Sequence, residues 1–341
     1  MLKISVNSLK PGTRLGKDIY SKDSKLLLRR GTFITQAHLN VFAKRRIREV
    51  YILESDLPVK VLPDFECVYN NCLNTVKSFM LRAKLGEGLD FEEIGETIDS
   101  LFEQVLNQAD ILKKMRLIKK RGEYLFSHSV NVALLCMLLG KWLDCEPVTI
   151  KELGLAGLFH DIGKVYVDEA ILNKPGRLTA AEFEHIKKHT LLGYIFLNDN
   201  SWINKSISSA VLMHHERADG SGYPLGKKGY DVNFYAAVVA VADIYDAITS
   251  DRVYSPKRSP CVAIETIWDE SFGRLNPKIT KVFFDRMTSF FMGKRVLLSN
   301  NQEGTVVYVD PGEPTKPTVM AGNRLYNLRV DRSISIKRVI D

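Results

Sequence analysis

The sequence predicts a mainly α-helical protein, with a small mixed α/β module before the helical part and a small β module after it. Two changes in pattern support this prediction. Apolar residues recur close to every 3.6 positions through most of residues 65–292, and they follow a period of two after Met292. The first 57 residues instead combine short β-like runs with one helical stretch.

The elements can be placed in order. At the N-terminal end, Thr35 is a suitable cap for a helix over 35–48. Thr179 and Glu182 fit a capping box that starts a later helix. β-like runs lie at 2–6, 25–29 and 49–53. Further helices are expected within 90–120 and at about 127–143, 149–160, 179–197, 203–214, 233–250, 260–271 and 277–290. Strands are expected at 295–299, 305–310, 318–321 and 333–339.

Proline residues separate the first module from the helices, because Pro58 and Pro63 break the chain. We therefore expect four segments. They are a basic α/β module at 1–57, a linker and helical lead-in at 58–119, a helical domain at 120–291 and a β module at 292–341.

The net charge of +8 is concentrated at the ends of the chain. Residues 1–60 hold 13 Lys/Arg against 5 Asp/Glu, residues 61–291 hold 27 against 30, and residues 292–341 hold 8 against 5. A basic module can attract phosphates, acidic lipids or an acidic protein partner, although a solvated surface explains the charge equally well. It contains no base-reading motif, so nucleic-acid binding is not expected. A protein partner for this module and a homodimer are left open.

A membrane span is not expected. The most apolar stretch, Val130–Leu143, is interrupted by Asn131, Gly140 and Lys141 and is too short to cross a bilayer. The first residues contain no apolar core of a signal peptide. These features predict a cytoplasmic protein.

Six of the seven histidines lie between positions 128 and 215. A single histidine on an apolar helix is most often a core residue, but clustering among acidic residues is typical of a metal site. His160 and Asp161 follow the apolar run 153–159, so a buried helix delivers them at its end. A carboxylate can bridge two ions, which makes Asp161 the natural centre of a dinuclear site. Lys164, at i+3, could meet a phosphate oxygen.

Asp243 lies in an almost entirely apolar, alanine-rich run over 235–248. A buried carboxylate needs a metal ion, a cation or strong donors, so Asp243 is a further ligand candidate; a buried salt bridge is the alternative. Asp246, one turn later, could orient a ligand or contact the substrate.

A glycine-rich loop follows the pair His214-His215. Gly220 and Gly222 let the backbone turn sharply near a ligand, Tyr223 can stack on a substrate or donate to it, and Pro224 stiffens the exit. His185 and His189, four residues apart on one helical face, could both bind one metal, and spacing alone does not choose between one ligand and two.

This ordered set resembles the HD-GYP branch of the HD phosphohydrolase superfamily, over about half the chain (residues 120–285). The motifs are His128, His160-Asp161-Ile162-Gly163-Lys164, His189, His214-His215-Glu216-Arg217, Asp219-Gly220-Ser221-Gly222-Tyr223-Pro224 and Asp243 through Asp251-Arg252. The resemblance implies an all-helical HD-type domain with iron or manganese and no organic cofactor. It also implies hydrolysis of the bacterial messenger cyclic di-GMP to pGpG, and often onward to GMP.

The resemblance also implies roles for individual residues. The first ion would be held by His128, His160, Asp161 and Asp243, and the second by Asp161, His189 and His214, with His215 close by. His185 is left out. Tyr124 stands where some members carry a glutamate for a third ion, so two ions are expected. Asp161 and Lys164 would be catalytic, and the substrate would meet Lys164, Gly220, Gly222, Tyr223, Pro224, Asp246, Arg252 and, as a weaker candidate, Lys257.

The resulting hypothesis is phosphodiester hydrolysis by a hydroxide that bridges two ions and attacks in line with the 3′-oxygen leaving group. Lys164 and Arg252 would stabilise the negative charge that develops. Two alternatives stay open. One is a receptor that binds cyclic di-GMP without hydrolysing it, and the other is an HD phosphohydrolase that acts on another nucleotide or cyclic dinucleotide.

Overall fold

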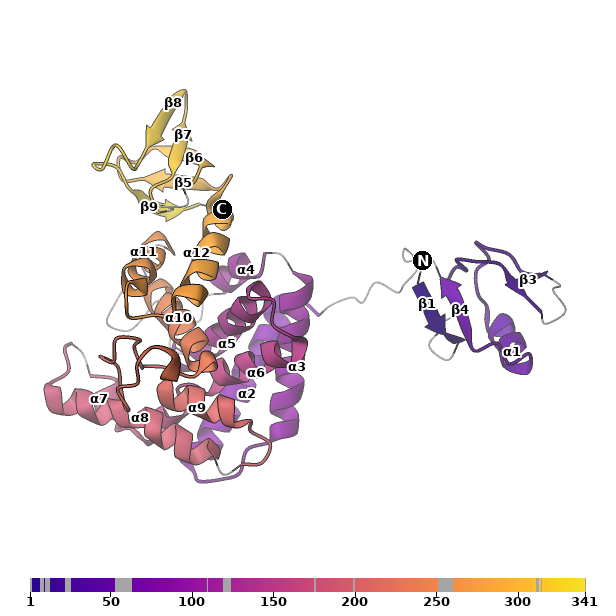
Figure 1. Cartoon of the computed structure of the whole chain (residues 1–341), viewed down its shortest axis with the longest axis horizontal. Coiled ribbons are helices and arrows are strands. Elements are labelled where there is room, and N and C mark those ends of the chain that lie inside the picture. The colour runs from indigo at the N-terminus through magenta and orange to yellow at the C-terminus, as the bar shows by residue number, and fades with distance from the viewer. Residues whose placement is uncertain are drawn as a thin grey trace. The chain divides into compact units, whose positions relative to one another are not determined.

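The structure is a computed structural model. It describes residues 2–6, 9, 13–21, 26–52, 63–108, 110–118, 124–174, 176–198, 200–250, 260–310, 313 and 315–340. The chain divides into two units, Met1–Leu62 and Pro63–Asp341, each described by itself (Figure 1).

The first unit is a small α/β module, as predicted. Two antiparallel strand pairs, β1 (Leu2–Ser5) with β4 (Glu49–Ile52) and β2 (Ile19–Tyr20) with β3 (Leu26–Leu28), accompany helix α1 (Gln36–Lys44). Thr35 caps α1, because its hydroxyl accepts a hydrogen bond from the backbone N–H of His38. The helix ends earlier than expected, where Arg46 adopts a left-handed φ of 55°. The hydrophobic core of this first unit is formed by Leu9, Leu15, Ile34, Phe42, Val50 and Ile52.

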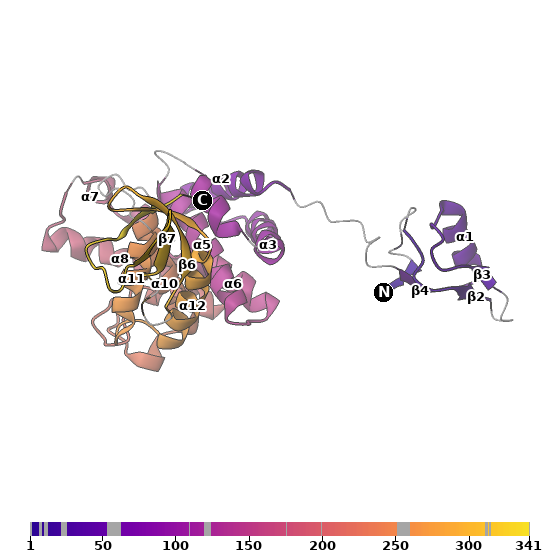
Figure 2. The ribbon, with the colours of Figure 1, turned by 90° about the horizontal axis from the view of Figure 1, so that it is seen from above.

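The second unit begins with a helical domain and ends with a β-sheet. Its helices are α2 (Phe65–Lys84), α3 (Phe91–Asn107), α4 (Ile111–Leu117), α5 (Tyr124–Trp142), α6 (Pro147–Phe159), η3 (Ile162–Tyr166), α7 (Glu169–Leu172), α8 (Ala180–Asn198), α9 (Lys205–Met213), η4 (Gly229–Asp231), α10 (Phe234–Thr249), α11 (Pro260–Ser271) and α12 (Pro277–Phe291). Helices α2 and α3 pack side by side (Figure 2). The mainly helical prediction is therefore confirmed.

The sheet follows α12 directly (Figure 1). Its strands are β5 (Arg295–Leu298), β6 (Glu303–Tyr308), β7 (Thr318–Ala321), β8 (Arg324–Asn327) and β9 (Ile336–Val339), in the spatial order β8-β7-β6-β5-β9 with antiparallel pairing throughout. Val296, Val306 and Val319 face inward from three neighbouring strands and join the same hydrophobic core as the helices. The small β module predicted for the C-terminal end is thus present.

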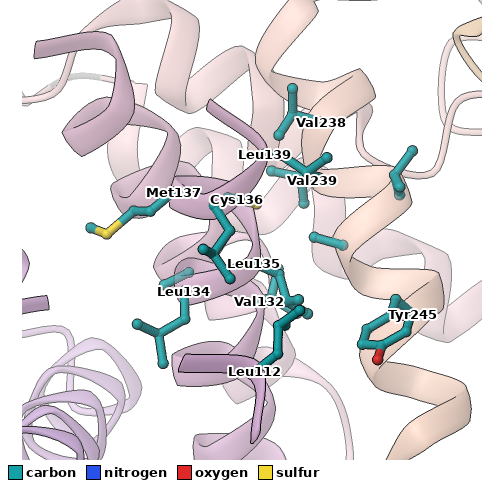
Figure 3. Packing of buried hydrophobic residues seen from close by; sticks show 14 of the residues in the cluster. Leu112, Val132, Leu134, Leu135, Cys136, Met137, Leu139, Val238, Val239 and Tyr245 are labelled. Atoms are coloured by element: carbon teal, nitrogen blue, oxygen red, sulfur yellow. The ribbon is translucent and has the colours of Figure 1, made fainter. Parts of the chain in front are cut away.

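Helices α5, α6 and α10 form the centre of the domain, and nearly every residue of α5 from His128 to Gly140 is buried. Figure 3 shows side chains of α5 and α10, among them Leu139 and Val239, packed between the two helices. Within the part of the chain that the structure describes, α5 alone is long and apolar enough to cross a membrane, and 67% of that window is buried inside the protein. Its apolarity is that of a core helix.

The helical lead-in differs from the sequence pattern in one respect. The apolar period predicted through 90–120 is interrupted after Asn107, where Gln108 is extended, and α4 starts only at Ile111. Both helices nevertheless pack into the main core through residues such as Leu101 and Ile111. The linker predicted around Pro58 lies outside the described residues, and the four-segment division of the chain stays a prediction.

Candidate metal centre

Five helices bring the predicted ligands to one buried place. His128 comes from the middle of α5, and Asp243 from α10. His160 and His214 are the C-caps of α6 and α9, and His189 lies on α8. Asp161 follows His160 directly and caps η3 at its N-terminus. The chain therefore turns from α6 into η3 at the His-Asp pair itself, which places two ligands of different kind at one helix end.

The first group of donor atoms belongs to His128, His160 and Asp243. The Nε2 atom of His128 lies 3.3 Å from Nε2 of His160 and 3.1 Å from Oδ1 of Asp243. The two imidazoles are buried, with 2% and 1% of their residue surface exposed. Two nitrogens and one carboxylate oxygen therefore converge on one point, as the ligands of a divalent ion do.

The second group belongs to His189, His214 and His215. The Nε2 atoms of His189 and His214 lie 3.4 Å apart, and both residues are fully buried. Asp161 lies between the two groups, since its Oδ2 is 3.3 Å from Nε2 of His160 while its Oδ1 is 3.4 Å from Nε2 of His189. Among the described residues, Oδ1 of Asp161 has no hydrogen-bond partner although it is buried. This carboxylate is placed to bridge two ions.

The hydrogen bonds behind the rings fix the form of each imidazole. Nδ1 of His160, His189 and His214 each donates to a carbonyl oxygen three residues earlier, at 2.7, 2.7 and 2.8 Å. Nδ1 therefore carries a proton in each ring, and wherever the ring is neutral Nε2 presents a lone pair. The lone pairs of His189 and His214 face each other at 3.4 Å, which is repulsive unless a cation lies beside them. The donor set thus fits bound metal.

The electrostatics agree with this assignment for the second group. Burial lowers the pKa of His189 to about 4 and that of His215 to about 3, so both rings are neutral near pH 7, the form that binds metal. Burial also disfavours the charge on Asp161, yet His160 and Lys164 hold the pKa of this carboxyl well below its usual range. Ionised carboxylate and neutral imidazoles together form a ligand set for divalent cations.

His128 is in a different environment. Burial disfavours its charge, but hydrogen bonds with Asp243 and Asp246 outweigh that effect and raise its pKa to about 9. In the metal-free protein a proton on Nε2 of His128 can therefore stand where an ion would bind. Metal binding at this position must displace that proton, so affinity should increase with pH.

Lys164 lies beside the bridging carboxylate. Its Nζ donates to Oδ2 of Asp161 at 2.6 Å, and 23% of its side chain is exposed. Lys164 lies in the 3₁₀ helix η3 and Asp161 is its N-cap residue, so the i+3 contact predicted from the sequence is made at the start of a tighter helix than expected. The ammonium of Lys164 is thus held beside the bridging carboxylate, on a side chain that stays partly exposed.

Asp246 contacts the candidate ligand His128 on the side of its ring that faces away from the other candidate ligands. Its Oδ2 accepts from Nδ1 of His128 at 2.7 Å, and its Oδ1 accepts from Asn131 at 2.8 Å and Ser250 at 2.9 Å. Only 4% of Asp246 is exposed. Of the two predicted roles, this geometry favours orienting a ligand over contacting the substrate.

We expect Asp246→Asn to weaken metal binding by about 10- to 100-fold, the range for partners of metal-ligating histidines. The amide can no longer accept from His128, Asn131 and Ser250 together, so the His128 ring loses its fixed tautomer. Titration of the metal-free protein with Mn²⁺, followed by calorimetry, measures the change. An unchanged dissociation constant would contradict the role.

Glu216 stabilises the loop that follows His215, a role that was not predicted from the sequence. Glu216 is 2% exposed, and its carboxylate accepts hydrogen bonds from the backbone N–H groups of Leu225, Gly226 and Lys227 at 2.6, 3.1 and 3.0 Å. In the sequence, the only indication of this role was an acidic residue about nine positions before a glycine turn. The hydrogen bonds themselves depend on the path of the loop, which the sequence does not show. Glu216 therefore fixes the exit of the loop.

The glycines and the tyrosine of this loop have distinct placements. A Cβ on Gly222 would overlap the backbone of residues 215–217, so only glycine fits there. Gly220 has a φ of 83°, in the left-handed region. The ring of Tyr223 stacks on His215, with centroids 4.7 Å apart, while Pro224 is exposed. The loop thus places an aromatic ring beside the second histidine group.

Some predicted residues lie elsewhere. Arg252 and Lys257 lie outside the described residues. His185 is half-buried and belongs to none of the candidate ligand groups found among the described residues. Tyr124 stacks on His128, with centroids 5.3 Å apart and the planes at 17°, and so covers a face of that ligand with an aromatic ring.

Comparison with known proteins finds one family model and several curated relatives. Residues 113–279 match the family model described as HD domain. The cyclic di-GMP phosphodiesterase PA4108 of Pseudomonas aeruginosa is 34% identical over 232 residues, which cover 68% of this chain and 56% of that protein. A cyclic di-GMP phosphodiesterase of Thermotoga maritima is 34% identical over 209 residues (61% and 55%). The 3′3′-cGAMP-specific phosphodiesterase 1 of Vibrio cholerae is 31% identical over 213 residues (59% and 48%).

The fold is also found among solved structures. Bd1817, an HDG"Y"P protein from Bdellovibrio bacteriovorus, superposes with a TM-score of 0.55 at 18% identity, over 84% of this chain and 99% of that one.

The chain spans about half the length of the curated relatives it matches. This chain carries a domain of the HD domain family, at residues 113–279. Within that family, the motifs from His160-Asp161 to Tyr223-Pro224 assign it to the HD-GYP branch.

Proposed function

We propose that this protein is a metal-dependent phosphodiesterase that hydrolyses cyclic di-GMP to pGpG, with GMP left open as a further product. The single observation that supports the reaction type best is the pair of histidine groups that share the carboxylate of Asp161. The substrate is supported by the relatives named cyclic di-GMP phosphodiesterases.

Two divalent ions, when bound, would supply Lewis acidity and make a water nucleophilic at neutral pH. The first would be held by His128, His160, Asp161 and Asp243, and the second by Asp161, His189 and His214, with His215 adjacent. Imidazole mixed with carboxylate suits iron or manganese, which we propose as the metals.

The chain's own residues would perform the remaining tasks. Lys164, paired with Asp161 and partly exposed, would neutralise charge on a phosphate oxygen as the ester bond breaks. Tyr223, supported by His215 and by the loop that Glu216 holds, would position the phosphodiester. Arg252 and Lys257 remain proposed phosphate contacts.

Other predictions from the sequence are part of this proposal. A protein partner for residues 1–57 and a homodimer are left open, and the cytoplasmic location expected from the sequence is retained. The catalytic domain would extend over 120–291.

The function is tested by turnover. Protein purified without oxygen and supplied with Fe²⁺ or Mn²⁺ should convert cyclic di-GMP to pGpG, whether or not GMP follows, and treatment with a chelator should abolish this. Binding of cyclic di-GMP without any product would favour the receptor alternative instead.

A second substrate has one observation in its favour, the similarity to a 3′3′-cGAMP-specific phosphodiesterase. A panel of cyclic di-GMP, 3′3′-cGAMP and cyclic di-AMP at equal concentration should rank cyclic di-GMP first by kcat/KM. Faster turnover of 3′3′-cGAMP would transfer the assignment to that messenger.

A further inference from the structure

A cluster of two aromatic rings and one ammonium group lies on α8 and the loop beside the metal centre. Phe183 meets Tyr223 edge to face, with centroids 6.2 Å apart. Nζ of Lys187 lies 4.9 Å from the Phe183 centroid and 5.3 Å from the Tyr223 centroid, so the ammonium faces both rings. We call Phe183, Lys187 and Tyr223 the α8 platform.

The platform is connected to the metal centre ring by ring. Tyr223 stacks on His215 at 4.7 Å, and the ring of His215 lies 5.3 Å from that of His189. His189 in turn faces Oδ1 of Asp161 at 3.4 Å. Tyr223 therefore lies between Phe183 and His215. A ligand that stacks on Phe183 would be separated from the second histidine group by the Tyr223 ring.

Exposure shows that the platform is not simply part of the core. Phe183 is 45% exposed, and 26% of the Lys187 side chain is exposed. The ammonium of Lys187 donates to Glu184 at 2.7 Å, which uses one of its three hydrogens. An open aromatic ring beside a cation is the arrangement on which proteins stack nucleobases.

We propose that Phe183 and Lys187 form a guanine-binding subsite, in which one base of a cyclic dinucleotide stacks on Phe183 and accepts a hydrogen bond from Lys187. The inference rests on the proposed function and names a part of its specificity. Guanine presents the acceptors O6 and N7 along one edge, whereas adenine offers N7 beside an amino donor, which an ammonium group cannot satisfy. Lys187 would therefore favour guanine over adenine at this position.

The test compares four variants of this chain, each with metal bound. Phe183→Ala should raise KM for cyclic di-GMP about tenfold or more through lost stacking, with kcat changed much less. Lys187→Met should raise KM for cyclic di-GMP about fivefold while leaving the inhibition constant of cyclic di-AMP, measured as a competitor, unchanged. Lys187→Arg should restore most of the loss. Leu191→Ala, an equally exposed apolar residue of the same helix, should behave as wild type.

The results separate the two proposals. If the wild-type protein hydrolyses no cyclic dinucleotide, the proposed function fails. If wild type is active but Phe183→Ala and Lys187→Met keep the wild-type KM at wild-type metal content, the subsite is wrong and the function stands. A Lys187→Met variant that weakens cyclic di-GMP and cyclic di-AMP equally would reduce Lys187 to a general phosphate attractor and would overturn the guanine assignment.

Discussion

Asp161→Asn is expected to abolish turnover, by at least about a thousandfold, while leaving the protein folded. Asparagine keeps the shape of the side chain but offers one acceptor oxygen in place of two. Its NH₂ group would point at an imidazole lone pair, either that of His160 or that of His189, and satisfy it with a hydrogen bond. The variant should therefore be no less stable in the metal-free form, yet it cannot bridge two ions.

Metal analysis, turnover and thermal unfolding should be measured on the same preparation. We expect metal content to fall from two ions per chain towards one or none, and the unfolding temperature of the metal-free protein to stay near that of wild type. Asp269→Asn, at an exposed position of α11, is the matched carboxylate-to-amide control and should change none of these values. An Asp161→Asn protein that kept two ions and wild-type turnover would refute the bridging role.

Local sequence singled out some of the candidate ligands, whereas the full set, with His189 and without His185, was implied only by the resemblance. The run before His160 is apolar throughout, so a buried helix must end near it, and α6 does end at Phe159. Asp243 stands out because an acid in an almost entirely apolar helix needs a compensating charge. Such arguments depend on neighbours within a few positions.

The partners of these residues could not be predicted, because they come from distant parts of the chain. Asp246 receives its hydrogen bond from His128, which lies 118 positions earlier. The platform joins Phe183 to Tyr223 across 40 positions, through packing of α8 against the loop. Periodicity shows which face of a helix is apolar, but it does not show which helix that face meets.

Short elements and helix breaks could not be predicted from the local sequence pattern either. Strand β8 (Arg324–Asn327) is four residues long, and its pairing with β7 rather than its sequence makes it a strand. No proline or glycine marks the break between α3 and α4. The helix α3 ends because Gln108 adopts an extended backbone conformation. Sequence patterns therefore indicated the kind of fold and several candidate ligands, and tertiary contacts decided the boundaries of the elements and the surroundings of each candidate ligand.

A single methyl group added at Gly163 should separate the two halves of the centre. In the structure Gly163 packs directly on the backbone of α8, where a Cβ would overlap the carbonyl oxygen of His189 and approach the nitrogen of Gly193 to 2.6 Å. Backbone atoms cannot rotate away as a flexible side chain can, so α8 must move outward. Because His189 lies only 3.4 Å from Asp161, that movement breaks the second ion's ligand set.

We therefore expect Gly163→Ala to cost about 1–3 kcal/mol of unfolding free energy, measured by urea denaturation, and to reduce turnover by about 100-fold. A first ion held by His128, His160, Asp161 and Asp243 would not depend on α8, so metal content should fall from two ions to one rather than to none. Gly95→Ala is the control, since a Cβ there meets only the Trp202 ring at an ordinary 3.6 Å. As a helix-interior glycine, it should be slightly stabilised by alanine. If Gly163→Ala binds two ions with wild-type affinity, close packing of η3 on α8 is not what sets the distance between the two histidine groups.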